Sequence, residues 1–186
     1  MRVLAISGSL RRESHNTKLL RNAEELLGTD VDFELYDALE SVPPYNEDRD
    51  GVDEPSAVAE MRARIEAADA LLIATPEYNS SIPGQLKNAV DWASRPVRAG
   101  ALWGKPAVVI GASTGFYGGV WAQAELRKVL STAGARVVDA EVAVSHADTR
   151  FDANGRLVDQ EIREELHAAL VALRAEVDPQ LAAAAA

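Results

Sequence analysis

The stretch Ile6-Ser7-Gly8-Ser9-Leu10-Arg11-Arg12-Glu13-Ser14-His15-Asn16-Thr17 decides how this chain folds. It follows the apolar run 3–6 and leads into residues 19–27, where leucine and alanine recur at helical spacing, so we expect a strand, a loop and a helix. The loop is rich in small and hydroxyl residues and carries two arginines. Because the first backbone N–H groups of a helix have no partner within the helix, this arrangement favours phosphate binding.

A second interpretation of the same loop stays open at this point. Gly8 then only permits a turn, Ser14 or Asn16 only caps the helix, and Arg11 is a solvated charge. The sequence has neither G-x-G-x-x-G nor G-x-x-x-x-G-K-[ST], which argues against a Rossmann dinucleotide fingerprint and a Walker A loop. One glycine with several hydroxyls and an arginine suits a terminal monophosphate, which points to a mononucleotide.

Alternating strand and helix patterns predict the fold class. Residues 31–36 alternate as in a half-buried strand near an edge, whereas 70–74 and 107–112 are continuous apolar runs typical of central parallel strands. A fifth strand is expected over 137–144, with a break by a bulge as one alternative. Together with five helical patterns, these strands predict an α/β fold: a doubly wound five-stranded parallel sheet of order 2-1-3-4-5, with helices on both faces.

The length and the apolar content predict one domain. A chain of 186 residues that is 47% hydrophobic can bury a sizeable core, so we expect one domain over 1–178 and a frayed tail over 179–186. Residues 37–53 contain two adjacent prolines and many charges, which predicts a long loop of the kind that often forms a lid or binds a ligand.

The composition excludes several classes of function. The sequence has no cysteine, so any redox chemistry has to come from a bound organic cofactor. A net charge of −10 opposes nonspecific binding to nucleic acid and to anionic membranes, and we expect neither as a partner. No apolar run reaches the length of a membrane span and no signal-peptide pattern is seen, so a cytoplasmic protein is expected.

Three polar loops are expected to converge at one edge of the sheet. They begin at Ser7, Thr75 and Ser113, and each follows a strand whose carboxyl end borders the ligand crevice of this fold. Taken singly, each loop has a structural explanation: a proline-stiffened turn, glycines for helix clearance, or half-buried aromatic residues. Taken together, they suit a ligand that supplies its own chemistry, and FMN fits, with backbone N–H groups of the helix after Gly118 stabilising charge near N1.

Three motifs within these loops resemble the NADPH-dependent FMN reductase family. They are Gly8-Ser9-Leu10-Arg11 with Ser14 and Asn16, then Pro76-Glu77-Tyr78-Asn79, then Leu86-Lys87-Asn88-Ala89-Val90-Asp91-Trp92-Ala93-Ser94-Arg95-Pro96. The resemblance runs from Arg2 to about Gly134. It implies a flavodoxin-like fold, FMN as cofactor, NADPH or NADH as co-substrate, and a small quinone-like electron acceptor. It also implies a homodimer or homotetramer.

The resemblance assigns site residues position by position. The first loop would hold the FMN phosphate through Ser9, Arg11, Ser14, Asn16 and Thr17. The second would lie along the ring and the ribityl chain through Pro76, Glu77, Tyr78 and Asn79, and the third would close the other side through Ser113, Thr114 and Gly115. Tyr78, Trp92, Arg95 and Trp121 are alternative interface residues. No side chain is expected to act as a catalytic acid or base, because the flavin carries the chemistry.

The sequence indicates no metal or calcium site. His15, His146 and His167 lack metal-ligand spacing, so surface or capping roles are expected and no metal site is predicted. The sequence around Asp152 and Gly155 lacks the register of a calcium-binding loop and is interpreted as a turn. The function hypotheses are an FMN-dependent NAD(P)H oxidoreductase working by a ping-pong mechanism and, as alternatives, a flavodoxin-style electron carrier or a flavin-sensing interaction protein.

Overall fold

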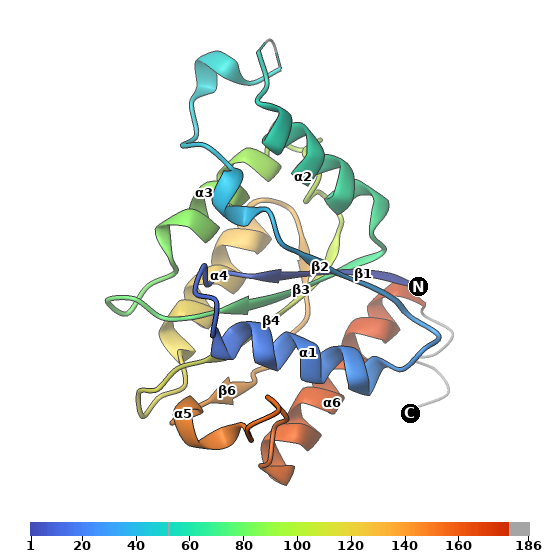
Figure 1. The fold of residues 1–186 in the computed structure, drawn as a ribbon. Coiled ribbons are helices and arrows are strands. Elements are labelled where there is room, and N and C mark those ends of the chain that lie inside the picture. The colour runs from blue at the N-terminus through green and yellow to red at the C-terminus, as the bar shows by residue number, and fades with distance from the viewer. Residues whose placement is uncertain (52, 179–186) are drawn as a thin grey trace.

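The computed structural model describes residues 1–51 and 53–178 of the chain (Figure 1). Its parallel sheet consists of β1 (Arg2–Ser7), β2 (Asp32–Tyr36), β3 (Ala70–Thr75), β4 (Pro106–Ala112), β5 (Arg136–Val137) and β6 (Ala143–Val144). The strand order is β2-β1-β3-β4-β5, with β6 also paired to β4. The predicted doubly wound sheet of order 2-1-3-4-5 is confirmed, with a sixth strand in addition.

Two short strands, β5 and β6, share the position where a single fifth strand was predicted. β5 pairs with the start of β4 and β6 pairs with its end. The chain between Val137 and Ala143 is longer than the part of β4 that it passes, from Ala107 to Gly111, so it leaves the sheet between the two pairings. The alternative of a broken fifth strand is therefore the one observed.

Helices cover both faces of the sheet, as expected of right-handed crossovers between parallel strands. α1 and α6 lie on one face, and α2, α3 and α4 lie on the other (Figure 1). The bounds of the helices are α1 (His15–Leu27), α2 (Ser56–Ala67), α3 (Gly84–Ala93), α4 (Val120–Thr132), α5 (Ala147–Arg150) and α6 (Gln160–Val177). The single-turn α5 was not predicted.

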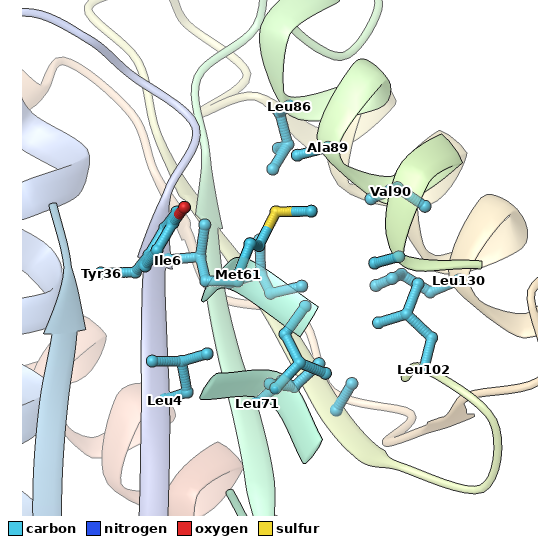
Figure 2. Close-up of a cluster of buried hydrophobic side chains, with 14 of the residues drawn as sticks. Leu4, Ile6, Tyr36, Met61, Leu71, Leu86, Ala89, Val90, Leu102 and Leu130 are labelled. Carbon is cyan, nitrogen blue, oxygen red and sulfur yellow. The ribbon is translucent and has the colours of Figure 1, made fainter. Parts of the chain in front are cut away.

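The core has two layers because alternate residues of each central strand point to opposite faces. In β3, Leu71 and Ile73 belong to the hydrophobic cluster beneath α2, α3 and α4, whereas Leu72 belongs to the cluster beneath α1 and α6. Figure 2 shows part of the first cluster, with Leu4 and Leu71 near the strands and Leu86 and Val90 on α3. This double burial explains the uninterrupted apolar runs of β3 and β4.

The long loop after β2 is fastened to one face of α3. Asn88 accepts a hydrogen bond from the Tyr45 N–H at 2.7 Å and donates one to the Pro43 carbonyl at 2.9 Å. Trp92 Nε1 donates to the same carbonyl at 2.8 Å, and Gln85 donates to two further carbonyls of the loop at 2.7 and 2.8 Å. The first part of the loop is therefore held against α3, and its role as a lid or binding loop stays a prediction. Trp92, which is fully buried, is excluded as an interface residue.

The predicted frayed tail over 179–186 lies outside the described residues. Over residues 1–51 and 53–178, no helix combines the length and the apolar character that crossing a bilayer requires.

Candidate functional site

The loops that follow β1, β3 and β4 line one groove at the carboxyl edge of the sheet. The groove has a volume of about 100 Å³. Nine of the twelve predicted site residues line it, namely Ser9, Arg11, Ser14, Asn16, Pro76, Glu77, Tyr78, Ser113 and Thr114. An adjoining hollow of about 380 Å³ shares Arg11 and Tyr78 with the groove. The three loops thus meet as the sequence predicts.

Three predicted residues lie outside the groove lining, and two unpredicted residues lie within it. Thr17, Asn79 and Gly115 do not line the groove, whereas His15 and Ala112 do. Sequence reasoning gave His15 a surface or capping role. The signal that was available is its position directly after the helix cap Ser14, which brings it to the groove together with the loop.

The first loop begins with a close approach between the chain at Gly8 and its neighbours. The Gly8 N–H donates to the Ala74 carbonyl at 2.8 Å, so the chain leaves β1 pressed against the end of β3. A Cβ atom at Gly8 would lie 2.7 Å from Leu86 Cδ2 and 3.3 Å from Pro76 Cδ. Gly8 therefore brings the first loop, the second loop and α3 together.

The end of the first loop is organised to expose hydrogen-bond donors. Ser14 Oγ accepts from the Thr17 N–H at 3.2 Å and so caps α1, while Thr17 Oγ1 donates to Ser7 Oγ at 3.0 Å. The N–H groups of the first helical turn that precede Thr17 have no partner within the helix. The Arg11 guanidinium makes no ion pair or hydrogen bond within residues 1–51 and 53–178. These donors and this unpaired cation are chemically suited to a phosphate group.

Asn16 connects the first loop to the third. Its Nδ2 donates to the Ala112 carbonyl and its Oδ1 accepts from the Ala112 N–H, both at 2.9 Å, and the side chain is buried. These bonds occupy the side chain of Asn16 with the end of β4. Asn16 therefore fixes the start of α1 relative to the third loop.

Glu77 connects the second loop to α4. Its Oε2 accepts from the N–H groups of Trp121 and Ala122, each at 3.1 Å, so the carboxylate caps this helix from another loop. The Val120 N–H donates to the Tyr117 carbonyl at 3.3 Å. The N–H groups of Val120, Trp121 and Ala122 thus have partners within the protein, and stabilisation of flavin charge by the start of this helix stays a prediction.

The tip of the second loop is a tight turn. Tyr78 and Ser81 exchange two backbone hydrogen bonds at 3.1 Å, and the two residues between them, Asn79 and Ser80, have φ of 53° and 58°. A hairpin turn of this kind requires positive φ at both central residues. Ser81 Oγ also donates to Glu125 Oε2 at 2.6 Å, so the turn is held against α4.

The third loop carries an exposed aromatic cluster. Phe116 and Tyr117 are 72% and 56% exposed and lie edge to face with centroids 5.1 Å apart, while Tyr117 meets Trp121 at 4.7 Å. Tyr117 is therefore a surface residue rather than a half-buried one. Gly118 has φ of +61°, and a Cβ there would lie 2.6 Å from the Ala143 carbonyl carbon, so β6 holds this loop in place.

The residues weighed as metal ligands form no metal site in the part of the chain that the structure describes. No group of three or more His, Asp and Glu side chains is placed to hold an ion there. Asp152 Oδ1 accepts from the N–H groups of Asn154 and Arg156, each at 2.8 Å, which makes the segment the turn that was predicted.

The chain is similar to known proteins over most of its length. Residues 1–149 match the family described as NADPH-dependent FMN reductase. An NAD(P)H-dependent FMN reductase of Pseudomonas aeruginosa is 46% identical over 175 residues, which is 94% of each chain. A 2-hydroxy-1,4-benzoquinone reductase of a Burkholderia species is 39% identical over 167 residues, or 89% of this chain and 90% of that one.

A solved structure shows the same relationship. The flavoenzyme FerB, an NAD(P)H:(acceptor) oxidoreductase of Paracoccus denitrificans, superposes with a TM-score of 0.80 at 36% identity and covers 95% of both chains. The extent of these matches, together with the phosphate-suited loop and the three-loop groove, settles the family. The chain belongs to the NADPH-dependent FMN reductase family.

Proposed function

We propose that this protein transfers electrons from NADPH or NADH to a small quinone-like acceptor, with FMN held in the groove between the three loops. The observation that carries the proposal is the meeting of the phosphate-suited first loop with the other two at the carboxyl ends of β1, β3 and β4. The relatives named as quinone reductases support the class of acceptor.

We propose the following roles for the chain's own residues. Arg11 supplies charge to the phosphate, and Ser9, Ser14 and the start of α1 supply hydrogen-bond donors. The second loop, held to α4 by Glu77, and the third loop, held to α1 by Asn16, keep the walls of the groove apart at a fixed distance. The remaining predicted residues, Thr17, Pro76, Tyr78, Asn79, Ser113, Thr114 and Gly115, would complete the contacts to FMN.

Bound FMN supplies the redox chemistry, since it accepts a hydride and delivers two electrons. In the overall reaction, reduced nicotinamide is oxidised and a quinone takes up two electrons and two protons to become a hydroquinone. The groove contributes by positioning, since the Glu77 carboxylate of its lining already caps α4 and Arg11 is assigned to the phosphate.

The test is a spectrum followed by kinetics. The purified protein is expected to show the visible absorption of FMN and, with NADPH and 1,4-benzoquinone, parallel lines in double-reciprocal plots. NADPH should bleach the flavin in stopped-flow mixing at least as fast as steady-state turnover. If NADPH bleaches the flavin too slowly to support turnover, the proposal is contradicted and an electron carrier is favoured.

Assembly, domain extent and compartment belong to the same proposal. We propose a homodimer or homotetramer, because Trp103 and Val97 are 52% and 67% exposed beside a hollow of about 560 Å³ between α3 and α4. Light scattering of the purified protein tests this oligomeric state. We also propose that residues 1–178 form one domain, for which a single unfolding transition is expected. A cytoplasmic location, in keeping with the absence of cysteine, is tested by cell fractionation.

A further inference from the structure

His15 lies at the phosphate-suited end of the groove. It is the first residue of α1, directly after the cap Ser14, and it lines the groove with Arg11. Its imidazole stacks on Phe151, with ring centroids 5.9 Å apart and planes 17° apart. The stacking holds one face of the ring against the protein and leaves the ring edge for other contacts.

The hydrogen-bonding capacity of this ring is unused by the protein. Within residues 1–51 and 53–178, neither ring nitrogen has a hydrogen-bond partner, and Nδ1 is buried. With Nδ1 enclosed, Nε2 is the nitrogen left to reach a ligand in the groove. A phosphate oxygen there would give the ring a partner that the chain itself does not provide.

The charges that face His15 come from three elements. Arg11 of the first loop and Lys18 of α1 are positive, and Asp148 of α5 is negative. Lys18 Nζ lies 3.4 Å from the Glu13 carboxylate, which offsets part of its charge. Burial, followed by Lys18 and Arg11, holds the pKa of His15 below its ordinary value, against the opposing effect of Asp148. The imidazole is therefore neutral at neutral pH while no anion is bound.

We propose that His15 is a pH-dependent ligand of the FMN phosphate, taking up a proton from solvent on binding and donating a hydrogen bond from Nε2 to a phosphate oxygen. This inference rests on the proposed function, because it requires FMN in this groove. In a protein with a net charge of −10, such a local cation offsets the general repulsion of a phosphate.

The direction of the pH effect follows from linkage between proton and ligand binding. A phosphate beside the ring raises the pKa of His15 above its lowered free-state value. As pH falls through the bound-state pKa, the affinity for FMN rises, and the gain is complete below the free-state pKa. Each unit between the two pKa values corresponds to a tenfold gain in affinity.

The test is calorimetry of flavin-free protein titrated with FMN. Wild type and His15→Phe, which keeps an aromatic ring against Phe151, are compared between pH 6.5 and 8.5 in buffers of different ionisation enthalpy. We expect wild type to take up more protons on binding and to lose about tenfold more affinity over this range than the variant. Ionisation of the FMN phosphate near pH 6 is common to both proteins and cancels in the comparison.

Controls separate a local role from a general one. Riboflavin, which lacks the phosphate, should bind equally to both proteins, and His167→Gln on the exposed side of α6 should behave as wild type. If His15→Phe fails to bind riboflavin, His15→Gln, which stays neutral at every pH, takes its place. Equal proton uptake and equal pH slopes for FMN would overturn the role of His15, whereas no FMN binding by wild type would overturn the proposed function itself.

Discussion

Asn16 and Ala112 exchange two hydrogen bonds, each 2.9 Å long, between the start of α1 and the end of β4. The two residues are far apart in sequence, and their contact fixes the distance between the phosphate-suited loop and the third loop of the groove. Asn22, also buried in α1, donates to the carbonyls of Lys18 and Gly155 and accepts from the Leu157 N–H, each at 2.8 Å, away from the groove.

Asn16→Ala is expected to weaken both the fold and FMN binding. It leaves the Ala112 N–H and carbonyl without partners, which costs about 1–3 kcal/mol of unfolding free energy. Urea denaturation and flavin titration measure the two effects. Asn22→Ala is the matched control, expected to lose similar stability with an unchanged FMN dissociation constant. Equal FMN affinity in the two variants would contradict a positioning role for Asn16.

Arg11→Ala is expected to release FMN far more readily than Arg12→Ala. Arg11 lines the groove, whereas Arg12 lines a neighbouring hollow toward β2 that shares Ser9 and Arg11 with the groove. Loss of a charge-assisted hydrogen bond to phosphate costs about 1.5–3 kcal/mol, which corresponds to roughly tenfold to hundredfold in affinity. Flavin fluorescence during dialysis follows the release. Similar retention by the two variants would count against this geometry of the loop.

Glu77→Ala is expected to destabilise the protein by about 1–2 kcal/mol, because it removes the carboxylate that caps α4. Glu125→Ala is the control. It removes an exposed carboxylate of α4 that accepts from Ser81 of the second loop, so its effect should stay within about 0.5 kcal/mol. Urea midpoints compare the two variants, and an equal loss in both would show that the cap contributes nothing specific.

Gly118→Ala is expected to be markedly more destabilising than Gly119→Ala. Both glycines have positive φ, at 61° and 84°, so both substitutions strain the backbone. At Gly118 the new Cβ would also lie 2.6 Å from the Ala143 carbonyl carbon, whereas at Gly119 the nearest atoms are 3.7 Å away. This overlap is expected to make Gly118→Ala about 1–3 kcal/mol more destabilising than Gly119→Ala, which thermal unfolding measures. Similar melting temperatures of the two variants would refute the prediction.

Tyr36→Phe is expected to stabilise the protein by about 1 kcal/mol. Its hydroxyl is buried without a partner in the part of the chain that the structure describes, at the position labelled in Figure 2. Burial raises the pKa of Tyr36, Glu60 raises it further and Arg64 opposes the effect. In the unfolded chain the Tyr36 hydroxyl ionises at about pH 10, below its pKa in the folded protein. Wild type therefore loses stability above that pH.

Urea denaturation of wild type and Tyr36→Phe between pH 8 and 11 tests this directly. The variant should lose less stability than wild type above about pH 10. Tyr117→Phe, at an exposed position, is the control and should follow wild type. A less stable Tyr36→Phe protein would mean that the hydroxyl makes a favourable interaction.

The sequence determined the sheet order and the convergence of the three loops. Uninterrupted apolar runs identify strands buried on both faces, and polar loops after such strands meet at one edge by the geometry of parallel sheets. The motif around Asn88 and Trp92 was recognised as well, but its packing against the loop after β2 was not, because that loop has no periodic pattern to read.

Only the tertiary structure decided which polar groups remain available to a ligand. Sequence reasoning treated Asn16, Glu77 and the start of α4 as open to FMN, yet Asn16 is bonded to Ala112 and Glu77 already caps α4. His15, for which the sequence predicted only a surface or capping role, lines the groove, and its ring makes no hydrogen bond to residues 1–51 and 53–178. Partners from distant segments satisfy buried polar groups, and local sequence does not specify those partners.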